Sequence, residues 1–285
     1  MRAALAQAPL LARAIPHGNG ETLPAVGTGS AIIFDVGSDQ AARARLTQVV
    51  QTLVAGGGKL IDTAPSYGTA ESVIGDIVAA AGLRPKLFLS TKLERYPKGG
   101  MAAEAKECLA RLKTGKLDLL HLHNVRDPNQ DLGELNALKE EGVIRYTGIT
   151  TTFEASYDAA EAILKRTKPD FLEIDYAIDN REAEKRLLPA ARDAGSAVLT
   201  ALPFGRGRLF RTALGKPLPD FAADIDCKSW AQFFLKFNLS HPAVTAVIPG
   251  TDKPEYMTDN LGAARGRLPD AAMRERMAKY VETMR

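Results

Sequence analysis

The sequence predicts a single (β/α)8 barrel, and two regularities of the chain lead to this prediction. Short apolar segments rich in β-branched residues recur along the sequence, and the segments between them carry apolar residues at helical spacing. Glycines stand where several of these helical segments end, as at Gly82, Gly115, Gly142 and Gly195. The 285 residues fit one barrel, and no linker or low-complexity tract divides them.

Eight strands alternate with helices in the predicted order. Strands are expected at 25–29, 59–63, 87–91, 117–122, 144–150, 171–176, 197–202 and 244–249. Helices are expected at 70–81, 102–112, 132–141, 153–165 and 182–194, with another at about 229–239. Strands joined by single helices pair in parallel through right-handed crossovers, so eight such units close into a barrel. An open doubly wound sheet is the alternative, but Gly27-Thr28-Gly29-Ser30-Ala31 lacks the third glycine of a dinucleotide-binding loop.

A hairpin is expected before the first strand. The segments 14–16 and 21–23 flank His17-Gly18-Asn19-Gly20, which is typical of a tight turn between antiparallel strands. Such a hairpin would cover the bottom of the barrel. We therefore take residues 1–14 as an N-terminal extension and residues 15–285 as one barrel domain.

The composition is that of a soluble globular protein and excludes several classes of function. The net charge is +3, and the 37 basic and 34 acidic residues are spread along the chain, so no nucleic-acid partner is expected. No apolar run approaches the roughly 20 residues that cross a bilayer, so no membrane partner is expected either. Cys108 and Cys227 lie far apart, which favours free thiols over a disulfide or a thiolate metal site.

Free thiols indicate a reducing compartment, and we expect a cytoplasmic monomer, with a dimer as the alternative. The segment Ala4-Leu5-Ala6-Gln7-Ala8 is similar to the end of a secretory signal, but only Arg2 precedes it and the apolar stretch is short. A periplasmic location applies only if residues 1–14 are the remnant of a longer signal.

Four polar residues follow consecutive predicted strands, at the end where barrel enzymes place their active sites. Asp62 ends the second strand and Tyr67 lies in the loop after it, while Lys92 ends the third strand and His123 the fourth. Taken singly, each has an ordinary structural explanation, as a helix cap, a rim aromatic, a surface cation or a core histidine. Together they meet at one barrel mouth, which predicts a proton-transfer site.

The chemistry of such a group is specific. A tyrosine has an ordinary pKa of about 10, and a cation within a few ångströms lowers that pKa by stabilising the phenolate. An aspartate paired with Lys92 would hold the cation in place at the partly buried mouth. A neutral histidine can donate a hydrogen bond to a substrate carbonyl oxygen and orient it.

Three separated groups of motifs carry a resemblance to a known family. The first is Leu60-Ile61-Asp62-Thr63-Ala64-Pro65-Ser66-Tyr67-Gly68, followed by Glu71 and Gly75. The second is Ser90-Thr91-Lys92 with Leu119-Leu120-His121-Leu122-His123-Asn124, and the third is Val247-Ile248-Pro249-Gly250-Thr251 with Asp259-Asn260. In this order they resemble the aldo/keto reductases, over roughly residues 15–268.

The resemblance implies that the chain reduces a small aldehyde or ketone to an alcohol by hydride transfer from NAD(P)H. It implies a tetrad in which Tyr67 is the general acid, Lys92 and Asp62 tune its acidity, and His123 orients the carbonyl.

The resemblance also implies which residues hold the nicotinamide cofactor. The family's Ser-Asn pair aligns with Thr150 and Thr151, so a hydroxyl is kept and an amide is lost. Glu173 aligns with the family's glutamine and can still accept a hydrogen bond from the carboxamide NH2. Ala201 aligns with a stacking tyrosine, for which Phe204 is a substitute. The pyrophosphate is expected against the backbone amides of Gly205, Gly207 and Leu209.

The adenosine end is expected at Gly250, Thr251, Asp252, Tyr256, Asp259 and Asn260. Family members that prefer NADPH commonly have an arginine where Tyr256 stands, and Asp252 would repel a 2′-phosphate that Lys253 would attract. We therefore expect NADPH as the cofactor, with NADH as the alternative and weak discrimination between the two.

His121 precedes His123 by two residues, so both side chains face the barrel interior. A His-x-His pair is also typical of metal-dependent hydrolases, but such sites need further histidines on later strands, and only His17 and His241 remain. We expect no metal and a hydrogen-bonded core position for His121.

Two other functions are compatible with such a barrel. A lyase would use Lys92 as a Schiff-base nucleophile, and a nucleotide-binding regulatory subunit would keep the fold without turnover. Tyr67 beside Lys92 argues against the regulatory subunit, because a binding protein has no need of this pair. Ala31 and Asn124 align with the family's pocket tryptophans, and the chain ends soon after the last helix, which predicts an open, less aromatic pocket for small or varied carbonyl substrates.

Overall fold

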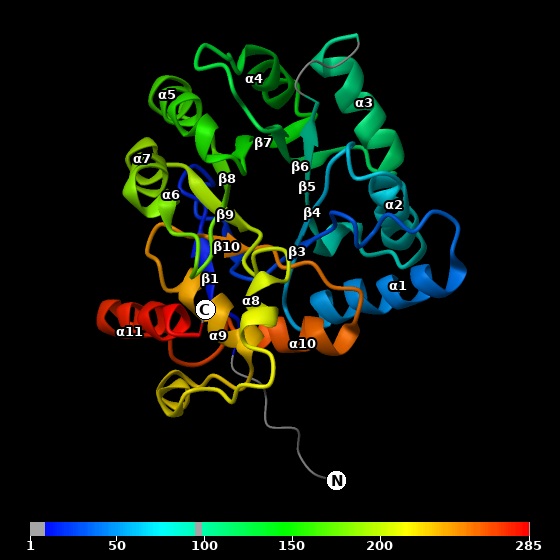
Figure 1. Ribbon diagram of the computed structural model, residues 1–285. Coiled ribbons are helices and arrows are strands. Elements are labelled where there is room, and N and C mark those ends of the chain that lie inside the picture. Colours follow the sequence, from blue (N-terminus) through cyan, green and yellow to red (C-terminus); the bar gives the residue numbers. More distant parts are fainter. Residues whose placement is uncertain (1–8, 95–98, 285) are drawn as a thin grey trace.

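The computed structural model describes residues 9–94 and 99–284 and confirms the barrel. Within these residues, eight parallel strands follow one another in chain order around the sheet, and a parallel bridge between Val26 and Val247 joins the last strand to the first. The strands are β3 (Thr28–Gly29), β4 (Leu60–Asp62), β5 (Phe88–Leu93), β6 (Leu117–Leu122), β7 (Ile144–Thr151), β8 (Phe171–Asp175), β9 (Ala197–Ala201) and β10 (Ala246–Val247). Figure 1 shows this ring of strands with the helices around its outside.

The helices that cover the barrel are amphipathic or largely buried. In α1, the side chain of Asp39 accepts a hydrogen bond from the amide of Ala42 and begins the helix, and Leu46, Val50 and Leu53 face the core at helical spacing. The helices are α1 (Gln40–Ala55), α2 (Ala70–Ala80), α3 (Met101–Arg111), α4 (Gly133–Glu140), α5 (Tyr157–Thr167), α6 (Glu182–Lys185), α7 (Leu187–Ala194), α8 (Arg208–Thr212), α9 (Trp230–Leu239), α10 (Pro254–Gly262) and α11 (Ala271–Glu282).

One expected helix is two helices. The segment 182–194 breaks at Arg186, whose φ of −139° is not helical, so α6 and α7 are separate. Pro189 explains the break, because a proline lacks an amide hydrogen and its ring clashes with the carbonyl four residues earlier, here that of Lys185.

The strands at both ends of the ring are also shorter than expected. In β10 the ladder stops before Pro249, which has no amide hydrogen to donate.

The N-terminal hairpin covers the bottom of the barrel, as expected. β1 (Ala12–Ala14) pairs antiparallel with β2 (Thr22–Pro24), so the hairpin begins within the stretch assigned to the extension. Residues 1–8 of that stretch lie outside the described residues. Ile15 and Leu23 are buried in one cluster with residues of the barrel interior, among them Phe88. The interior is therefore filled at its lower end.

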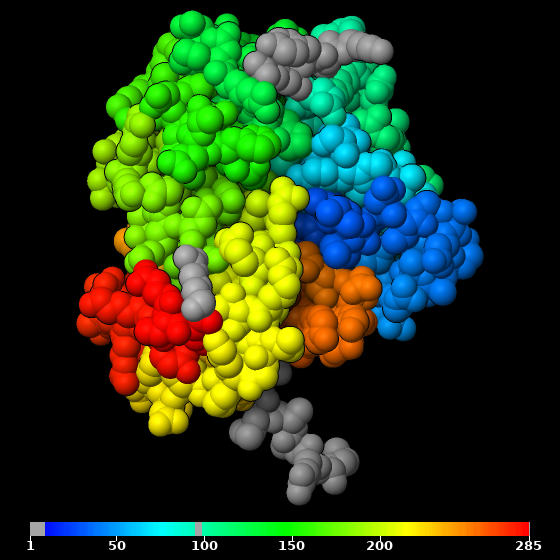
Figure 2. All heavy atoms as spheres, viewed as in Figure 1, coloured from blue at the N-terminus to red at the C-terminus, as the bar shows by residue number. Residues whose placement is uncertain are grey.

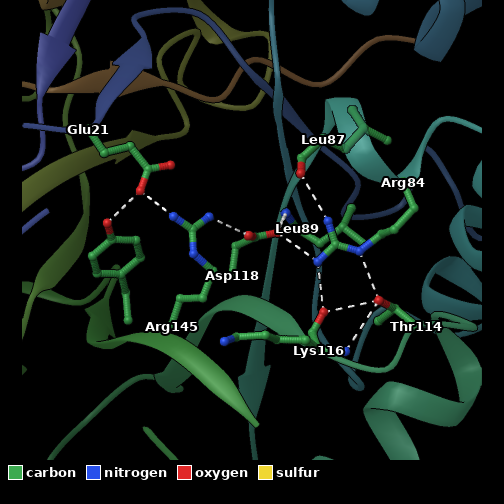
Figure 3. A network of polar contacts seen from close by, with 9 residues as sticks. Glu21, Arg84, Leu87, Leu89, Thr114, Lys116, Asp118 and Arg145 are labelled. Carbon is green, nitrogen blue, oxygen red and sulfur yellow. Dashed lines mark hydrogen bonds and ion pairs between the residues drawn. The ribbon is translucent and has the colours of Figure 1, made fainter. Parts of the chain in front are cut away.

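A network of charges ties this hairpin to the barrel (Figure 3). The carboxylate of Glu21 accepts from the hydroxyl of Tyr146 at 2.6 Å and from the guanidinium of Arg145. Arg145 also pairs with Asp118 at 2.7 Å, and Arg84 pairs with the same carboxylate at 2.9 Å. The network joins the hairpin to β6, β7 and the segment before β5, so the floor of the barrel is held by polar contacts as well as by packing.

Within the described residues, no helix is both long enough and apolar enough to cross a membrane.

Candidate active site

A buried ion pair lies where β4 and β5 end. The register pairs Asp62 with Ser90, so the two strands bring Asp62 and Lys92 to the same end of the sheet. Lys92 Nζ donates to Asp62 Oδ2 at 2.5 Å and to the carbonyl oxygen of Thr63 at 3.1 Å, and Ser90 Oγ donates to Asp62 Oδ1 at 2.8 Å. Both charged side chains are buried. The structure thus contains the aspartate–lysine pair that the sequence predicts.

A second carboxylate meets the same lysine. Glu173, in β8, places Oε2 at 3.0 Å from Lys92 Nζ and at 3.8 Å from Nε2 of His121. Burial, followed by the charge of Asp62, raises the pKa of Glu173 to about 8, although Lys92 acts in the opposite direction. The sequence predicts Glu173 only as a cofactor-binding residue, and its contact with Lys92 is an addition from the structure.

Tyr67 lies above this charge cluster in the loop after β4. Lys92 Nζ is 5.6 Å from the centre of the Tyr67 ring, and the ring of His123 meets it edge-on with 6.0 Å between the ring centres. Burial raises the pKa of Tyr67 to about 12, while the charge of Lys92 acts to lower it. We expected the cation to determine the pKa of the phenol, but in this structure burial has the larger effect. The phenol therefore holds its proton at neutral pH.

His123 is the first residue beyond β6. Burial, and then the charge of Lys92, lower the pKa of His123 to about 4, so its imidazole is neutral at neutral pH. A neutral ring carries one N–H and can donate one hydrogen bond. His123 therefore has the charge state that a carbonyl-orienting residue needs.

His121 is buried, as expected, but it is not hydrogen-bonded. Neither of its ring nitrogens has a hydrogen-bond partner among residues 9–94 and 99–284, and the 3.8 Å to Glu173 is too long for one. Its ring fills the space beside Gly148, where an added Cβ would lie 2.2 Å from Nδ1. Burial, and then Lys92, lower the pKa of His121 well below its ordinary value, so this imidazole is neutral too.

Asp62, His121 and Glu173 each place one potential metal-ligand atom within 4.8 Å of the others. The Lys92 ammonium already lies 2.5 Å and 3.0 Å from the two carboxylates. A divalent cation bound there would be repelled by an ammonium at contact distance. The two carboxylates therefore suit the ammonium of Lys92 rather than a metal ion.

A cavity of about 770 Å³ opens above these residues at the carboxyl ends of the strands. Figure 2 shows the yellow segment after β9 beside the dark-blue segment after β3, and residues of both line this cavity. Of the residues predicted from the sequence, those in its wall are Asp62, Tyr67, His123, Thr150, Glu173, Phe204, Gly207 and Gly250. Lys92 lies behind Asp62 and Glu173, within contact distance of both.

The rim of the cavity contains apolar residues that the sequence analysis missed. Ile32, Phe153 and Phe210 line the cavity and are 79%, 46% and 40% exposed. Phe153, Phe204 and Phe210 make the mouth more aromatic than we expected from Ala31 and Asn124, which also line it. The missed residues lie in loops or a short helix that follow predicted strands, so their position at the barrel mouth was a usable signal.

The expected pyrophosphate loop has a left-handed backbone. Gly205 and Gly207 have φ values of +55° and +81°, which glycine adopts without strain, and Arg206 between them has a φ of +54°, which is uncommon for a residue with a side chain. The amides of Gly205, Gly207 and Leu209 donate to carbonyl oxygens of residues 202 and 204, and the Leu209 side chain is buried in the core. A pyrophosphate contact through these amides stays a prediction, and it would require the loop to exchange its internal hydrogen bonds.

The expected adenosine site lies at β10 and α10, and several of its side chains are already bonded. Asp259 accepts from Gln232 at 2.7 Å and from Ser229 at 2.6 Å, which ties α10 to the beginning of α9. Asn260 is buried, and its Nδ2 has no hydrogen-bond partner in the described part of the chain. Two further side chains of this region also have close neighbours. Lys253 Nζ lies 4.8 Å from the centre of the Tyr256 ring, and Thr251 Oγ1 accepts from the Lys253 amide at 3.1 Å.

The mouth of this closed barrel brings together a phenol, a neutral imidazole and a buried carboxylate–lysine pair, groups that are able to transfer a proton to a small molecule in the cavity. The family model described as "Aldo/keto reductase family" matches residues 25–280, and the chain belongs to this family. It is an oxidoreductase of this type.

Relatives of the chain agree with this assignment. The aldo-keto reductase str7 of Strobilurus tenacellus is 28% identical over 267 residues, which cover 78% of this chain and 77% of the relative. The methylglyoxal reductase YeaE of Escherichia coli (strain K12) is 29% identical over 233 residues, with 79% and 80% covered. Among solved structures, an aldo-keto reductase from Klebsiella pneumoniae in complex with NADPH has a TM-score of 0.78 at 23% identity and 95% coverage of both chains, a likeness of fold.

Proposed function

We propose that the protein reduces an aldehyde or a ketone to an alcohol, with NADPH as the hydride donor and Tyr67 as the proton donor. One observation supports this most strongly. Tyr67 and His123 face the same cavity, and the Lys92 ammonium lies beneath the phenol, 5.6 Å from the ring centre.

Polar atoms without a hydrogen bond in the cavity wall, one of which is the Glu173 oxygen that pairs with Lys92, fit a bound nicotinamide nucleotide. Ser30 Oγ and Glu173 Oε2 are buried and have no hydrogen-bond partner among the described residues, and both residues line the cavity. In our proposal Thr150 and Glu173 hold the carboxamide, Phe204 packs on the ring, and the orphaned amide of Asn260 binds the adenine. Lys253 favours NADPH over NADH as the cofactor, because it offers a positive charge near the expected 2′-phosphate.

When bound, the dihydronicotinamide supplies a hydride to the carbonyl carbon. The N–H of neutral His123 donates to the carbonyl oxygen and fixes its direction. Tyr67 transfers its phenolic proton to that oxygen as negative charge develops there, and Lys92 stabilises the phenolate that remains. This division of roles explains why Tyr67 is protonated at rest while a fixed cation lies close to its ring.

The alternative of a Schiff-base lyase is disfavoured by the surroundings of Lys92. Burial alone would lower the pKa of Lys92, but Asp62 and Glu173 raise it above its ordinary value. An amine that keeps its proton is a poor nucleophile.

The replacement Tyr67→Phe tests the proposal, because it removes only the phenolic oxygen and its proton. We expect the Kd for NADPH to stay within a few-fold and kcat for carbonyl reduction to fall by at least about 100-fold. Fluorescence titration with NADPH, followed by initial rates on a panel of aldehydes that includes methylglyoxal, measures both. Turnover by the variant close to that of the unmodified enzyme would contradict the assignment of Tyr67.

A further inference from the structure

The charges around Lys92 do not balance if both carboxylates are ionised. Asp62 and Glu173 carry two negative charges against the single ammonium of Lys92, and all three side chains are buried. An excess charge in the interior is costly, and a group in that position takes up a proton to relieve it.

Among residues 9–94 and 99–284, the remaining neighbours of Glu173 supply no second cation. The strands on either side of it place Thr150 of β7 and Leu199 of β9 opposite it, and neither is ionisable. From β6, His121 faces it at 3.8 Å and is neutral. Tyr67 lies beyond Lys92 and is neutral as well. The proton that balances the cluster is therefore held among Asp62, Lys92 and Glu173 themselves.

Glu173 is the carboxylate better placed to hold that proton. Asp62 accepts two side-chain hydrogen bonds, from Ser90 Oγ at 2.8 Å and from Lys92 Nζ at 2.5 Å. Glu173 Oε2 has the 3.0 Å charge contact with Lys92, but no hydrogen bond of ordinary geometry among the described residues. The rise in the pKa of Glu173 to about 8 agrees with this difference.

We propose that Glu173 is a positioning residue that acts on Tyr67 through Lys92 as a switchable counter-ion. When Glu173 is neutral, Lys92 and Asp62 form a balanced ion pair, and the ammonium can then stabilise the phenolate of Tyr67. Ionised Glu173 neutralises the charge of Lys92 and makes the phenol a weaker acid, since a nearby negative charge raises the pKa of Tyr67. The inference rests on the proposed function for its effect on reduction, but the proton on Glu173 is a property of the free protein.

The free protein gives the first test. We would follow the side-chain carboxyl carbons of the protein labelled with ¹³C at glutamate Cδ by NMR against pH, and assign Glu173 by the signal missing from Glu173→Gln. The signal should titrate near pH 8. Lys92→Met should move that midpoint upward, because the cation favours the ionised carboxylate. A midpoint in the ordinary range of glutamate, about 4.3, would overturn the proposal without any reference to catalysis.

The rate of reduction gives the second test, with saturating NADPH and one carbonyl substrate. In the unmodified enzyme, kcat should fall by up to about 10-fold from about pH 7 to about pH 9, as expected for loss of one proton with a midpoint near 8. Glu173→Gln should remove this fall, so that kcat changes by less than about two-fold over the same interval. Asp175→Asn is the matched control, an acid on the same strand whose charge interactions are with Arg208 and Arg206 rather than with Lys92, and it should keep the fall.

The outcomes are distinguishable. If Glu173→Gln raises KM for NADPH and keeps the pH-dependent fall, then Glu173 only binds the carboxamide and the switch is refuted. If the unmodified enzyme shows no fall, the switch is also refuted. If the protein turns over no carbonyl compound at all, the proposed function fails, and the NMR titration still decides whether Glu173 holds the proton beside Lys92. Thermal unfolding of each variant shows whether it is folded.

Discussion

At the scale of single residues, one charged neighbour can favour the charged form of one group and disfavour the charged form of another. The charge of Lys92 acts to lower the pKa values of His123, Tyr67 and Glu173 alike. This disfavours the charged form of His123 but favours the ionised forms of Tyr67 and Glu173. Sequence reasoning identified Lys92 and its partner Asp62 because they end neighbouring strands. It missed the contact with Glu173, because that contact depends on the register of four strands together, β5 to β8, which residue types alone do not determine.

The pair of Lys253 and Tyr256 leads to a prediction about cofactor choice. Lys253 Nζ lies over the Tyr256 ring at 4.8 Å, so the cation is held near the position where family members carry an arginine. A guanidinium binds a phosphate with two parallel hydrogen bonds, which neither a phenol nor a single ammonium does. We expect Tyr256→Arg to strengthen NADPH binding by roughly 1–3 kcal/mol and to leave NADH nearly unchanged.

Dissociation constants for both nucleotides, measured on both proteins at one ionic strength, check this prediction. Lys253→Met is the companion variant and should weaken NADPH binding alone. Equal changes for NADPH and NADH would mean that the 2′-phosphate binds elsewhere.

At the scale of elements, the sequence predicts where strands and helices lie better than where they stop. The eight strands and their order follow from apolar segments, because a barrel strand is buried on both faces. The break between α6 and α7 was missed although Pro189 is visible in the sequence, because the apolar spacing continues across it. The rim residues were missed for another reason: although they follow predicted strands, the segments that hold them have no periodicity that singles out Ile32, Phe153 or Phe210.

The apolar rim predicts a preference among substrates. Phe153 lines the cavity in the segment after β7 and is 46% exposed, so a substrate chain that leaves the cavity would bury its ring. Phe153→Ala should therefore lower kcat/KM for long-chain aldehydes by about 10-fold, while small aldehydes such as methylglyoxal change by less than about two-fold. Leu214→Ala is the control, since Leu214 is 82% exposed and lies outside the cavity wall. Equal losses for short and long aldehydes would exclude Phe153 as a determinant of chain length.

At the scale of the whole molecule, the proton on Glu173 links the site to stability. The folded protein holds that proton up to a pKa of about 8, whereas an unfolded glutamate releases it near its ordinary pKa of 4.5. The folded state therefore binds more protons between these values, and its stability falls as the pH rises through that window. The stabilising contribution is complete below the unfolded pKa and lost above the folded one.

Glu173→Gln has no such proton to lose, so its stability should improve relative to the unmodified protein as the pH rises from about 5 to about 9. The Tm of both proteins, measured by calorimetry at several pH values, gives the difference. All other ionisable groups are common to the two proteins, so their contributions to the difference in Tm largely cancel. A constant difference in Tm would show that Glu173 titrates alike in the folded and unfolded states.

The filled floor of the barrel also determines the order in which ligands bind and leave. Ile15 and Leu23 close the lower end, and the network from Glu21 to Arg84 holds them there, so the described chain leaves no passage along the barrel axis. In the described part of the chain, the cavity beside Tyr67 opens at the carboxyl ends of the strands, so a ligand enters and leaves there. The ligand that lies deeper in the cavity must therefore bind first and leave last, so binding and release in one turnover follow opposite orders.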